Sequence, residues 1–262
     1  MKLGIIGAGN MASALAGGML AAGAVKPAEL SISDMSEEKR ERWQSAGAYA
    51  TADNAEVAER SEVVIFAVKP NVLPGVLEEV KPFAGGRLFI SIAAGFELKR
   101  IEAVLGGAAK IVRVMPNTPA QVNCGMAVLS PNDNVTVGEL KTAEELFKAV
   151  GDAVVLDEKY INVATALHGS SPAYVYMMID AMADGGVKHG LPKQTALRLA
   201  AKAVEGSAKM VLETGKHPAS LKDDVCSPGG TTIAAVCELE KHGFYTALTA
   251  AIDACVEKAE NM

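Results

Sequence analysis

The stretch Leu3-Gly4-Ile5-Ile6-Gly7-Ala8-Gly9-Asn10-Met11-Ala12 decides how the rest of the chain is interpreted. Its first four residues form a short apolar run typical of a buried strand, and residues 13–20 after the glycines are rich in helix formers. A strand, a glycine turn and a helix in this order separate a dinucleotide-binding fingerprint from a chance match. The first glycine permits the tight turn, the second lets the backbone approach a diphosphate, and the third position must be small for packing. We therefore expect residues 7–12 to hold a diphosphate at the helix N-terminus.

Composition limits the class of protein. The chain has 262 residues, half of them hydrophobic, which is enough for one large domain or two ordinary ones. A net charge of −6 and the lack of a Lys/Arg run argue against a nucleic-acid surface. We find no long apolar stretch for a membrane span and no basic-then-apolar leader. The four cysteines are scattered, which fits reduced thiols better than a disulfide frame or a metal site. We expect a cytoplasmic globular protein without metal, nucleic-acid partner or membrane.

Apolar runs typical of strands alternate with helical segments through the first part of the chain. The candidate strands after the first are residues 29–33, 48–51, 62–68, 87–92 and 110–115, with residues 126–129 and 153–156 as edge strands. The run 62–68 is apolar throughout, as in a strand covered on both faces. Repeated strand–helix units of this kind predict an α/β fold, with a mostly parallel, doubly wound Rossmann-type sheet.

From about Tyr160 the strand-like runs disappear. Helical patterns cover residues 161–167, 173–184, 193–213, 231–241 and 244–259. We predict a dinucleotide-binding domain at residues 1–158 and an all-helical domain at residues 159–262. The helices carry small and apolar residues on more than one face, which favours a helix-swapped dimer over a compact monomer.

The ends of the candidate strands supply further site candidates. Asp34 ends the second strand, where an acidic residue often binds the ribose 2′-hydroxyl of a dinucleotide. Lys39 and Arg40 follow a turn later and are either phosphate ligands or a solvated helix face, so the choice between NAD and NADP stays open. The segment Ala67-Val68-Lys69-Pro70 ends the strongest strand, and such strand ends line the ligand crevice of a parallel sheet.

A polar stretch interrupts the helical half at residues 221–233. It contains a glycine pair flanked by Ser227, Thr231 and Thr232, each of which can cap a helix. An ordinary cap is the simpler interpretation, but paired glycines let the backbone approach a ligand, and free amides at a helix start bind carboxylates. The four histidines are far apart and indicate no acid–base pair, with His168 at a helix junction as the one candidate. This fits hydride transfer, in which the cofactor carries the difficult chemistry.

Taken together, these motifs resemble pyrroline-5-carboxylate reductase. The resemblance covers essentially the whole chain and rests on residues 7–12, 67–70, 93–95, 115–119, 170–174, 183–187 and 221–233. It implies reduction of the cyclic imine (S)-1-pyrroline-5-carboxylate to L-proline, the last step of proline synthesis, by NADPH or NADH. It also implies a homo-oligomer built from dimers of interleaved helical domains.

The resemblance assigns roles residue by residue. The implied cofactor-binding residues are Gly7, Ala8, Gly9, Asn10, Met11, Ala12, Asp34, Asn54, Ala67, Val68, Lys69, Pro70 and Ala94. The implied substrate-binding residues are Glu158, Asp224, Val225, Ser227, Gly229, Gly230, Thr231 and Thr232. Thr232, near the imine nitrogen, is the catalytic candidate. One departure is that the family usually has Ser-Gly-Ser-Gly-Pro-Ala-Tyr where this chain has His168-Gly169-Ser170-Ser171-Pro172-Ala173-Tyr174.

Other classes share part of this pattern. A β-hydroxyacid dehydrogenase or an F420-dependent NADP oxidoreductase also joins a Rossmann half to a helical half, but the former needs a catalytic lysine motif that we do not find. A non-catalytic, nucleotide-sensing regulator could use the same fold. The intact Pro-Gly-Gly-Thr-Thr loop at residues 228–232 argues against the regulator.

Overall fold

The computed structural model describes residues 1–261 and consists of two compact units. The first unit contains Met1–Gly169 and the segment that begins at Lys258, and the second contains Ser170–Glu257. The domain division after residue 158 that the sequence suggests stays a prediction.

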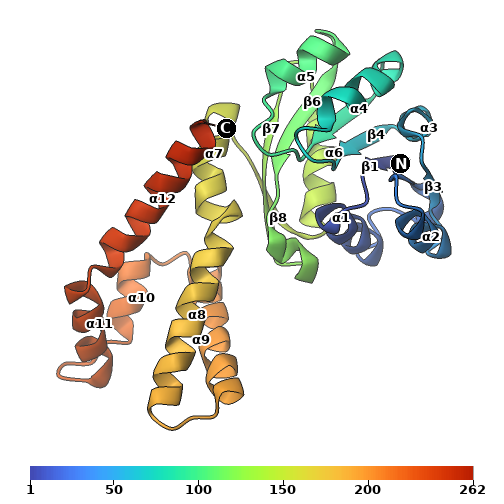
Figure 1. The fold of residues 1–262 in the computed structure, drawn as a ribbon. Coiled ribbons are helices and arrows are strands. Elements are labelled where there is room, and N and C mark those ends of the chain that lie inside the picture. The colour runs from blue at the N-terminus through green and yellow to red at the C-terminus, as the bar shows by residue number, and fades with distance from the viewer. Residues whose placement is uncertain (262) are drawn as a thin grey trace. The chain divides into compact units, whose positions relative to one another are not determined.

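The described part of the first unit forms one eight-stranded sheet in the order β3-β2-β1-β4-β5-β6-β7-β8 (Figure 1). The strands are β1 (Leu3–Ile6), β2 (Leu30–Ser33), β3 (Tyr49–Thr51), β4 (Val63–Phe66), β5 (Leu88–Ser91), β6 (Lys110–Met115), β7 (Gly125–Pro131) and β8 (Gly151–Val155). All neighbouring pairs are parallel except β6 with β7. The chain order reverses between β1 and β4, which is where open α/β sheets bind ligands. The predicted doubly wound sheet is confirmed.

Helices cover both faces of this sheet. They are α1 (Asn10–Ala21), α2 (Glu37–Ser45), α3 (Asn54–Arg60), α4 (Leu73–Val80), α5 (Leu98–Leu105), α6 (Val137–Lys148) and α7 (Ile161–Ala164). Side chains alternate across the sheet, so that Ile5 and Ile65 join the core under α1 and α6, whereas Ile6 and Phe66 join the core under α3, α4 and α5. Two buried cores follow, one on each face, as the apolar strand runs predict.

Three local predictions differ from the structure. Residues 126–129 are not an edge strand, because β7 runs antiparallel beside β6 and leaves only β8 at that edge. The helix expected at residues 161–167 changes after Ala164 into a π-helical turn, Thr165–Gly169. The polar stretch at 221–233 is not all loop, because the short helix α10 (Pro218–Asp224) begins at a proline in its first turn and extends into it.

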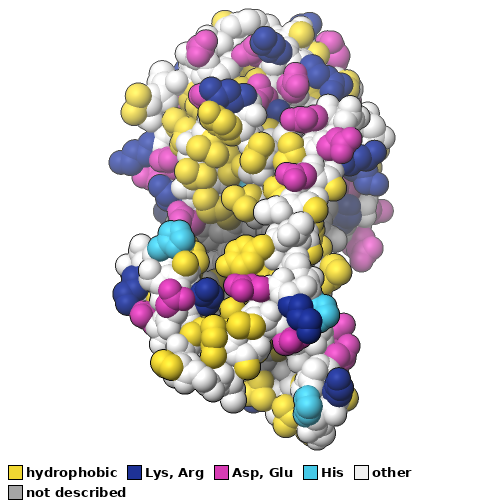
Figure 2. All heavy atoms as spheres, turned by 90° about the vertical axis from the view of Figure 1, so that its left-hand side faces the viewer, with side chains coloured by type: hydrophobic (Ala, Val, Ile, Leu, Met, Phe, Trp, Pro, Cys, Tyr) yellow, Lys and Arg dark blue, Asp and Glu magenta, His cyan; other side chains and the backbone are white. Residues whose placement is uncertain are grey.

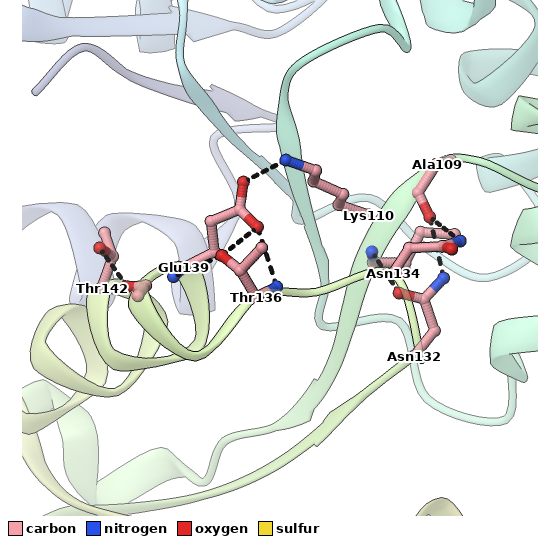
Figure 3. A network of polar contacts seen from close by, with 9 residues as sticks. Ala109, Lys110, Asn132, Asn134, Thr136, Glu139 and Thr142 are labelled. Atoms are coloured by element: carbon pink, nitrogen blue, oxygen red, sulfur yellow. Dashed lines mark hydrogen bonds and ion pairs between the residues drawn. The ribbon is translucent and has the colours of Figure 1, made fainter.

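The reversed strand β7 is anchored at its end by a polar network (Figure 3). Asn132 donates to the Ala109 carbonyl at 2.9 Å and accepts from the Ile111 amide at 3.1 Å. Beside it, Lys110 contacts Glu139 at 2.6 Å, and Glu139 forms a capping box with Thr136 at the start of α6. The Asn132 bonds satisfy backbone groups at the start of β6, beside the end of the reversed strand.

The second unit is helical. Its helices are α8 (Ser171–Lys188), α9 (Lys193–Thr214), α10, α11 (Thr231–Lys241) and α12 (Phe244–Glu260), the last of which continues into the first unit. Helices α8 and α9 form an antiparallel pair (Figure 1). Their buried residues are only the small Ala183, Ala196 and Ala200. Large apolar side chains stay exposed, including Met177 at 73% and Leu212 at 82%, and Figure 2 shows hydrophobic side chains open to the surface among charged ones. The helices therefore present apolar surface that one copy does not cover. Within residues 1–261, no helix has the length and apolar character to span a membrane.

Candidate active site

The glycine turn after β1 is shaped by its neighbours. Gly7 has φ +98°, and a Cβ at this position would lie 2.7 Å from the Ala67 carbonyl oxygen, so only glycine fits. Gly9 differs, because no atom lies within 4 Å of the place its Cβ would take. The turn is thus packed against β4 on one side and open on the other.

Gly9 caps α1 without a side-chain hydrogen bond. The first hydrogen bond of the helix runs from the Ser13 amide to the Gly9 carbonyl at 2.9 Å. The amides of Asn10, Met11 and Ala12 come before it and have no acceptor within the helix. Ala12 is 3% exposed and packs in the core, as the third fingerprint position requires. Free amides and the helix dipole make this N-terminus suitable for a diphosphate.

Three segments meet at the carboxyl edge of the sheet because their strands are in register. Ile6 pairs with Ser33 of β2 and with Phe66 of β4, so that the next residues, Gly7, Asp34 and Ala67, lie side by side. Backbone bonds continue this alignment, with the Gly7 amide 2.7 Å from the Ser33 carbonyl and the Ala67 amide 2.8 Å from the Ile6 carbonyl. The structure thereby brings together the glycine turn and two of its predicted partner segments.

Asp34 is tied to the glycine turn. Its Oδ2 accepts from the Ala8 amide at 2.8 Å and from Lys39 Nζ at 3.1 Å, and its Oδ1 accepts from the Ser36 amide at 2.9 Å. Partial burial raises the pKa of the Asp34 carboxyl, but these amides and the Lys39 ammonium outweigh burial and lower the pKa overall. The carboxylate is therefore fixed and ionised at the end of β2.

The other cofactor candidates occupy the same edge in different ways. Val68 packs near Gly7, whereas Lys69 and Pro70 are exposed. Ala94 is exposed in the loop after β5. Asn54, at the start of α3, accepts from Ser33 Oγ and donates to Glu79 Oε2, each at 2.7 Å, so its amide already has partners. An adenosine contact by Asn54 stays a prediction. The donors at α1, the carboxylate at β2 and the open space at Gly9 fit a dinucleotide.

An apolar recess beside this edge contains a residue that the sequence analysis missed. The recess is lined by the loop at residues 93–95, by the end of β6, and by Ile161 and Thr165. Arg113 lies in it, 7% exposed, and its Nη1 is 2.9 Å from Oε1 of Glu158. The same Oε1 accepts from the Leu98 amide at 2.8 Å. The sequence feature that could have indicated this site residue is the lone arginine inside the apolar strand 110–115. Glu158, predicted to contact substrate, binds these two groups in the structure, and its substrate role stays a prediction.

His168 lies in the π-helical turn and contacts backbone. Its Nε2 is 2.9 Å from the Met115 carbonyl, and its Nδ1 faces the Ala164 carbonyl. Asn117 donates to the His168 carbonyl at 3.0 Å. The ring connects the end of β6 to the last turn of the first unit, so this histidine has a structural role.

The glycine pair of the second unit starts α11. Gly230 is the N-cap and no side-chain bond caps the helix, so the simpler interpretation of this stretch, an ordinary cap by Ser227, Thr231 or Thr232, does not hold. A Cβ at Gly230 would collide with Ser227 Oγ, so a larger residue would fit at this N-cap position only if Ser227 moved. The first hydrogen bond of the helix runs from the Ala234 amide to the Gly230 carbonyl at 3.4 Å. The amides of residues 231–233 come before it and have no acceptor within the helix.

The hydroxyls of this loop are exposed. Thr231 and Thr232 are exposed at the start of α11, as are Ser227 and Gly229, which has φ +67°. Upstream, Val225 is 63% exposed, and Asp224 pairs with Lys216 at 3.0 Å. The loop thus offers free amides and hydroxyls at one helix N-terminus, a suitable cradle for a small carboxylate.

Comparisons with known proteins cover both units. Residues 158–262 match the family model described as pyrroline-5-carboxylate reductase dimerisation, and residues 2–95 match the model described as NADP oxidoreductase, coenzyme F420-dependent. The pyrroline-5-carboxylate reductase of Escherichia coli is 44% identical over 263 residues, covering 100% of this chain and 98% of that protein. The Arabidopsis thaliana enzyme is 41% identical, covering 100% and 95%. The chain belongs to the pyrroline-5-carboxylate reductase family.

Solved structures of this family agree. The Plasmodium falciparum pyrroline carboxylate reductase with NADP bound has a TM-score of 0.90 at 34% identity, covering 100% of this chain and 97% of that one. The Coxiella burnetii pyrroline-5-carboxylate reductase has a TM-score of 0.94 at 35% identity, covering 99% and 97%. The predicted family and fold are therefore confirmed. The F420-dependent alternative is limited to the shared Rossmann half, because that model ends at residue 95.

Proposed function

We propose that the chain reduces (S)-1-pyrroline-5-carboxylate to L-proline with NADPH or NADH, as the names of its pyrroline-5-carboxylate reductase relatives indicate. The observation that carries the proposal is a pair of glycine-initiated helices, α1 and α11, each with free N-terminal amides. One suits a diphosphate and the other a small carboxylate. A dinucleotide and an imino acid carry these two anions.

The cofactor-binding part of the proposal uses the carboxyl edge of the sheet. Residues 7–12 hold the diphosphate, Asp34 faces the adenosine ribose, and Asn54 lies on the adenosine side. Residues 67–70 and Ala94 line the rest of the dinucleotide. The alignment of Gly7, Asp34 and Ala67 by strand register supports this assignment. When bound, the nicotinamide supplies the hydride that reaches the imine carbon.

The substrate-binding part of the proposal uses the loop before α11. The amides and hydroxyls of Ser227, Gly229, Gly230, Thr231 and Thr232 hold the substrate carboxylate, with Asp224, Val225 and Glu158 around the ring. The Thr232 hydroxyl donates a hydrogen bond at the imine nitrogen. If the imine binds already protonated, the nitrogen needs no further proton, and if it binds neutral, Thr232 or a water supplies one. The exposure of these hydroxyls supports a role in binding.

The assembly and location follow from the helical unit and the composition. We propose a homo-oligomer built from dimers of the helical domain at residues 159–262, with the dinucleotide domain at residues 1–158. The match to a dimerisation model and the exposed Met177 and Leu212 support this arrangement. We propose that the enzyme works in the cytoplasm, without nucleic acid. Its four free cysteines suit a reducing compartment.

The direct test is spectrophotometric. We expect loss of absorbance at about 340 nm when the protein is mixed with pyrroline-5-carboxylate and either nicotinamide cofactor, with proline as the product. A linear hydroxy acid with NAD serves as the control substrate and should not react. Binding of the dinucleotide without turnover of the imine, in a folded oligomer, would instead favour the nucleotide-sensing alternative.

A further inference from the structure

The end of β2 carries a negative charge where a dinucleotide ribose would lie. Asp34 directly follows Ser33, which pairs with the last residue of β1, and its carboxylate accepts from the Ala8 amide inside the glycine turn at 2.8 Å. The Asp34 side chain is only 14% exposed. Its second oxygen accepts from the Ser36 amide at 2.9 Å, so both oxygens are held and the side chain cannot rotate away without losing bonds.

The nearby cations are already engaged. Lys39 Nζ lies 3.1 Å from Asp34 Oδ2, and Arg40 Nη1 donates to the carbonyls of Asp34 and Met35 at 2.8 and 2.9 Å. A guanidinium and an ammonium near this strand end are the groups that would bind a ribose 2′-phosphate. Here Lys39 pairs with the Asp34 carboxylate and Arg40 binds backbone carbonyls, so a phosphate at this strand end would compete with bonds that both cations already make and would lie near the carboxylate.

We propose that Asp34 makes this chain select the dinucleotide without a 2′-phosphate, NADH, over NADPH. An ionised carboxylate accepts hydrogen bonds from ribose hydroxyls and repels a dianionic phosphate. The carboxyl stays ionised at neutral pH because its amide and ammonium partners lower its pKa. The inference rests on the proposed cofactor site, and it goes beyond that site by ranking the two cofactors.

Binding, measured separately from turnover, tests this. Isothermal titration of the intact oligomer with NADH and with NADPH should give a dissociation constant for NADPH at least about tenfold higher than for NADH. The variants Asp34→Ser and Asp34→Asn remove the charge and free Lys39, whereas Arg40 keeps its bonds to the backbone carbonyls of residues 34 and 35. Each should lower the dissociation constant of NADPH by about tenfold and raise that of NADH. Asp34→Asn keeps an acceptor for the Ala8 amide, so at least one variant should retain the turn.

Two controls sharpen the result. Glu37→Gln removes one exposed negative charge from the same region and should leave the NADH-to-NADPH ratio unchanged. Lys39→Gln in the Asp34→Ser background should cancel the gain in NADPH binding. The proposal is overturned if the unaltered chain binds NADPH as tightly as NADH, or if both Asp34 variants fold and leave the ratio unchanged. If neither dinucleotide binds, the cofactor site itself is wrong and the proposal fails with it.

Discussion

The two glycine-initiated helix starts differ in what holds them. At α1, Gly7 is pressed against the Ala67 carbonyl, Ala12 is buried, and the Ala8 amide is bonded to Asp34. At α11, Gly229 has open space around its Cβ position and the threonines are exposed. The N-terminus of α1, the first cradle, is therefore organised by the interior of its own unit. The N-terminus of α11, the second cradle, is exposed and is held by bonds within its own loop, such as that from the Gly230 amide to the Ser227 carbonyl at 3.0 Å. Variants at matched positions in the two cradles test whether this difference is real.

The largest effect is expected at Gly7. Gly7→Ala places a Cβ at φ +98° and 2.7 Å from the Ala67 carbonyl oxygen, so the strand edge must shift. We expect a loss of about 2–4 kcal/mol of unfolding free energy together with loss of dinucleotide binding. Chemical denaturation and NADH titration measure the two effects.

Gly9→Ala is the matched control, because Gly9 has φ −73° and open space. Its stability should change by less than about 0.5 kcal/mol, while dinucleotide binding weakens because the backbone can no longer approach the diphosphate. If Gly7→Ala were as stable as the unaltered chain, the first cradle would not be organised by packing.

The next effect is expected at Thr232 in the second cradle. Thr232→Ala removes an exposed hydroxyl, so kcat/KM for pyrroline-5-carboxylate should fall about tenfold or more, equivalent to about 1.4 kcal/mol, with unchanged stability and NADH binding. Thr232→Ser keeps the hydroxyl and should stay near the original rate. Equal kinetics for the alanine variant and the unaltered enzyme would remove Thr232 from the site.

A smaller effect is expected at Gly229. Gly229→Ala adds a methyl into open space but forces alanine to φ +67°, at a cost of about 1 kcal/mol. Because the loop is exposed, we expect a few-fold rise in the KM for the imine with little change in NADH binding. Gly138→Ala, in open space within α6 and at negative φ, is the matched control and should be neutral or slightly stabilising. A fall in NADH affinity for Gly229→Ala would contradict the comparison.

The same contrast explains what the sequence could predict. The apolar runs and the glycine turn predict the sheet, because strand burial and a positive φ leave a direct signature in residue type. The antiparallel direction of β7 has no such signature and depends on long-range bonds such as those of Asn132. The pair of buried Arg113 and partly exposed Glu158 likewise joins residues from β6 and from the segment after β8, which pattern alone does not connect. Capping by Ser227, Thr231 or Thr232, the simpler interpretation that the sequence left open, does not occur because Gly230 is the N-cap.

The smallest effect concerns acid stability and the bond between Asp34 and the first cradle. Partial burial raises the Asp34 pKa, but the Ser36 and Ala8 amides and Lys39 lower it overall. Because the folded pKa lies below the unfolded value of about 3.9, the stabilisation from ionised Asp34 is fully present above that value. It is lost as the pH falls through the folded pKa. The stability difference between the unaltered chain and Asp34→Asn should therefore be constant near neutrality and shrink below about pH 4. Denaturant midpoints measured from pH 3 to pH 7 give this difference, and a difference that grew on acidification would mean that the Ala8 bond does not stabilise the turn through the charged carboxylate.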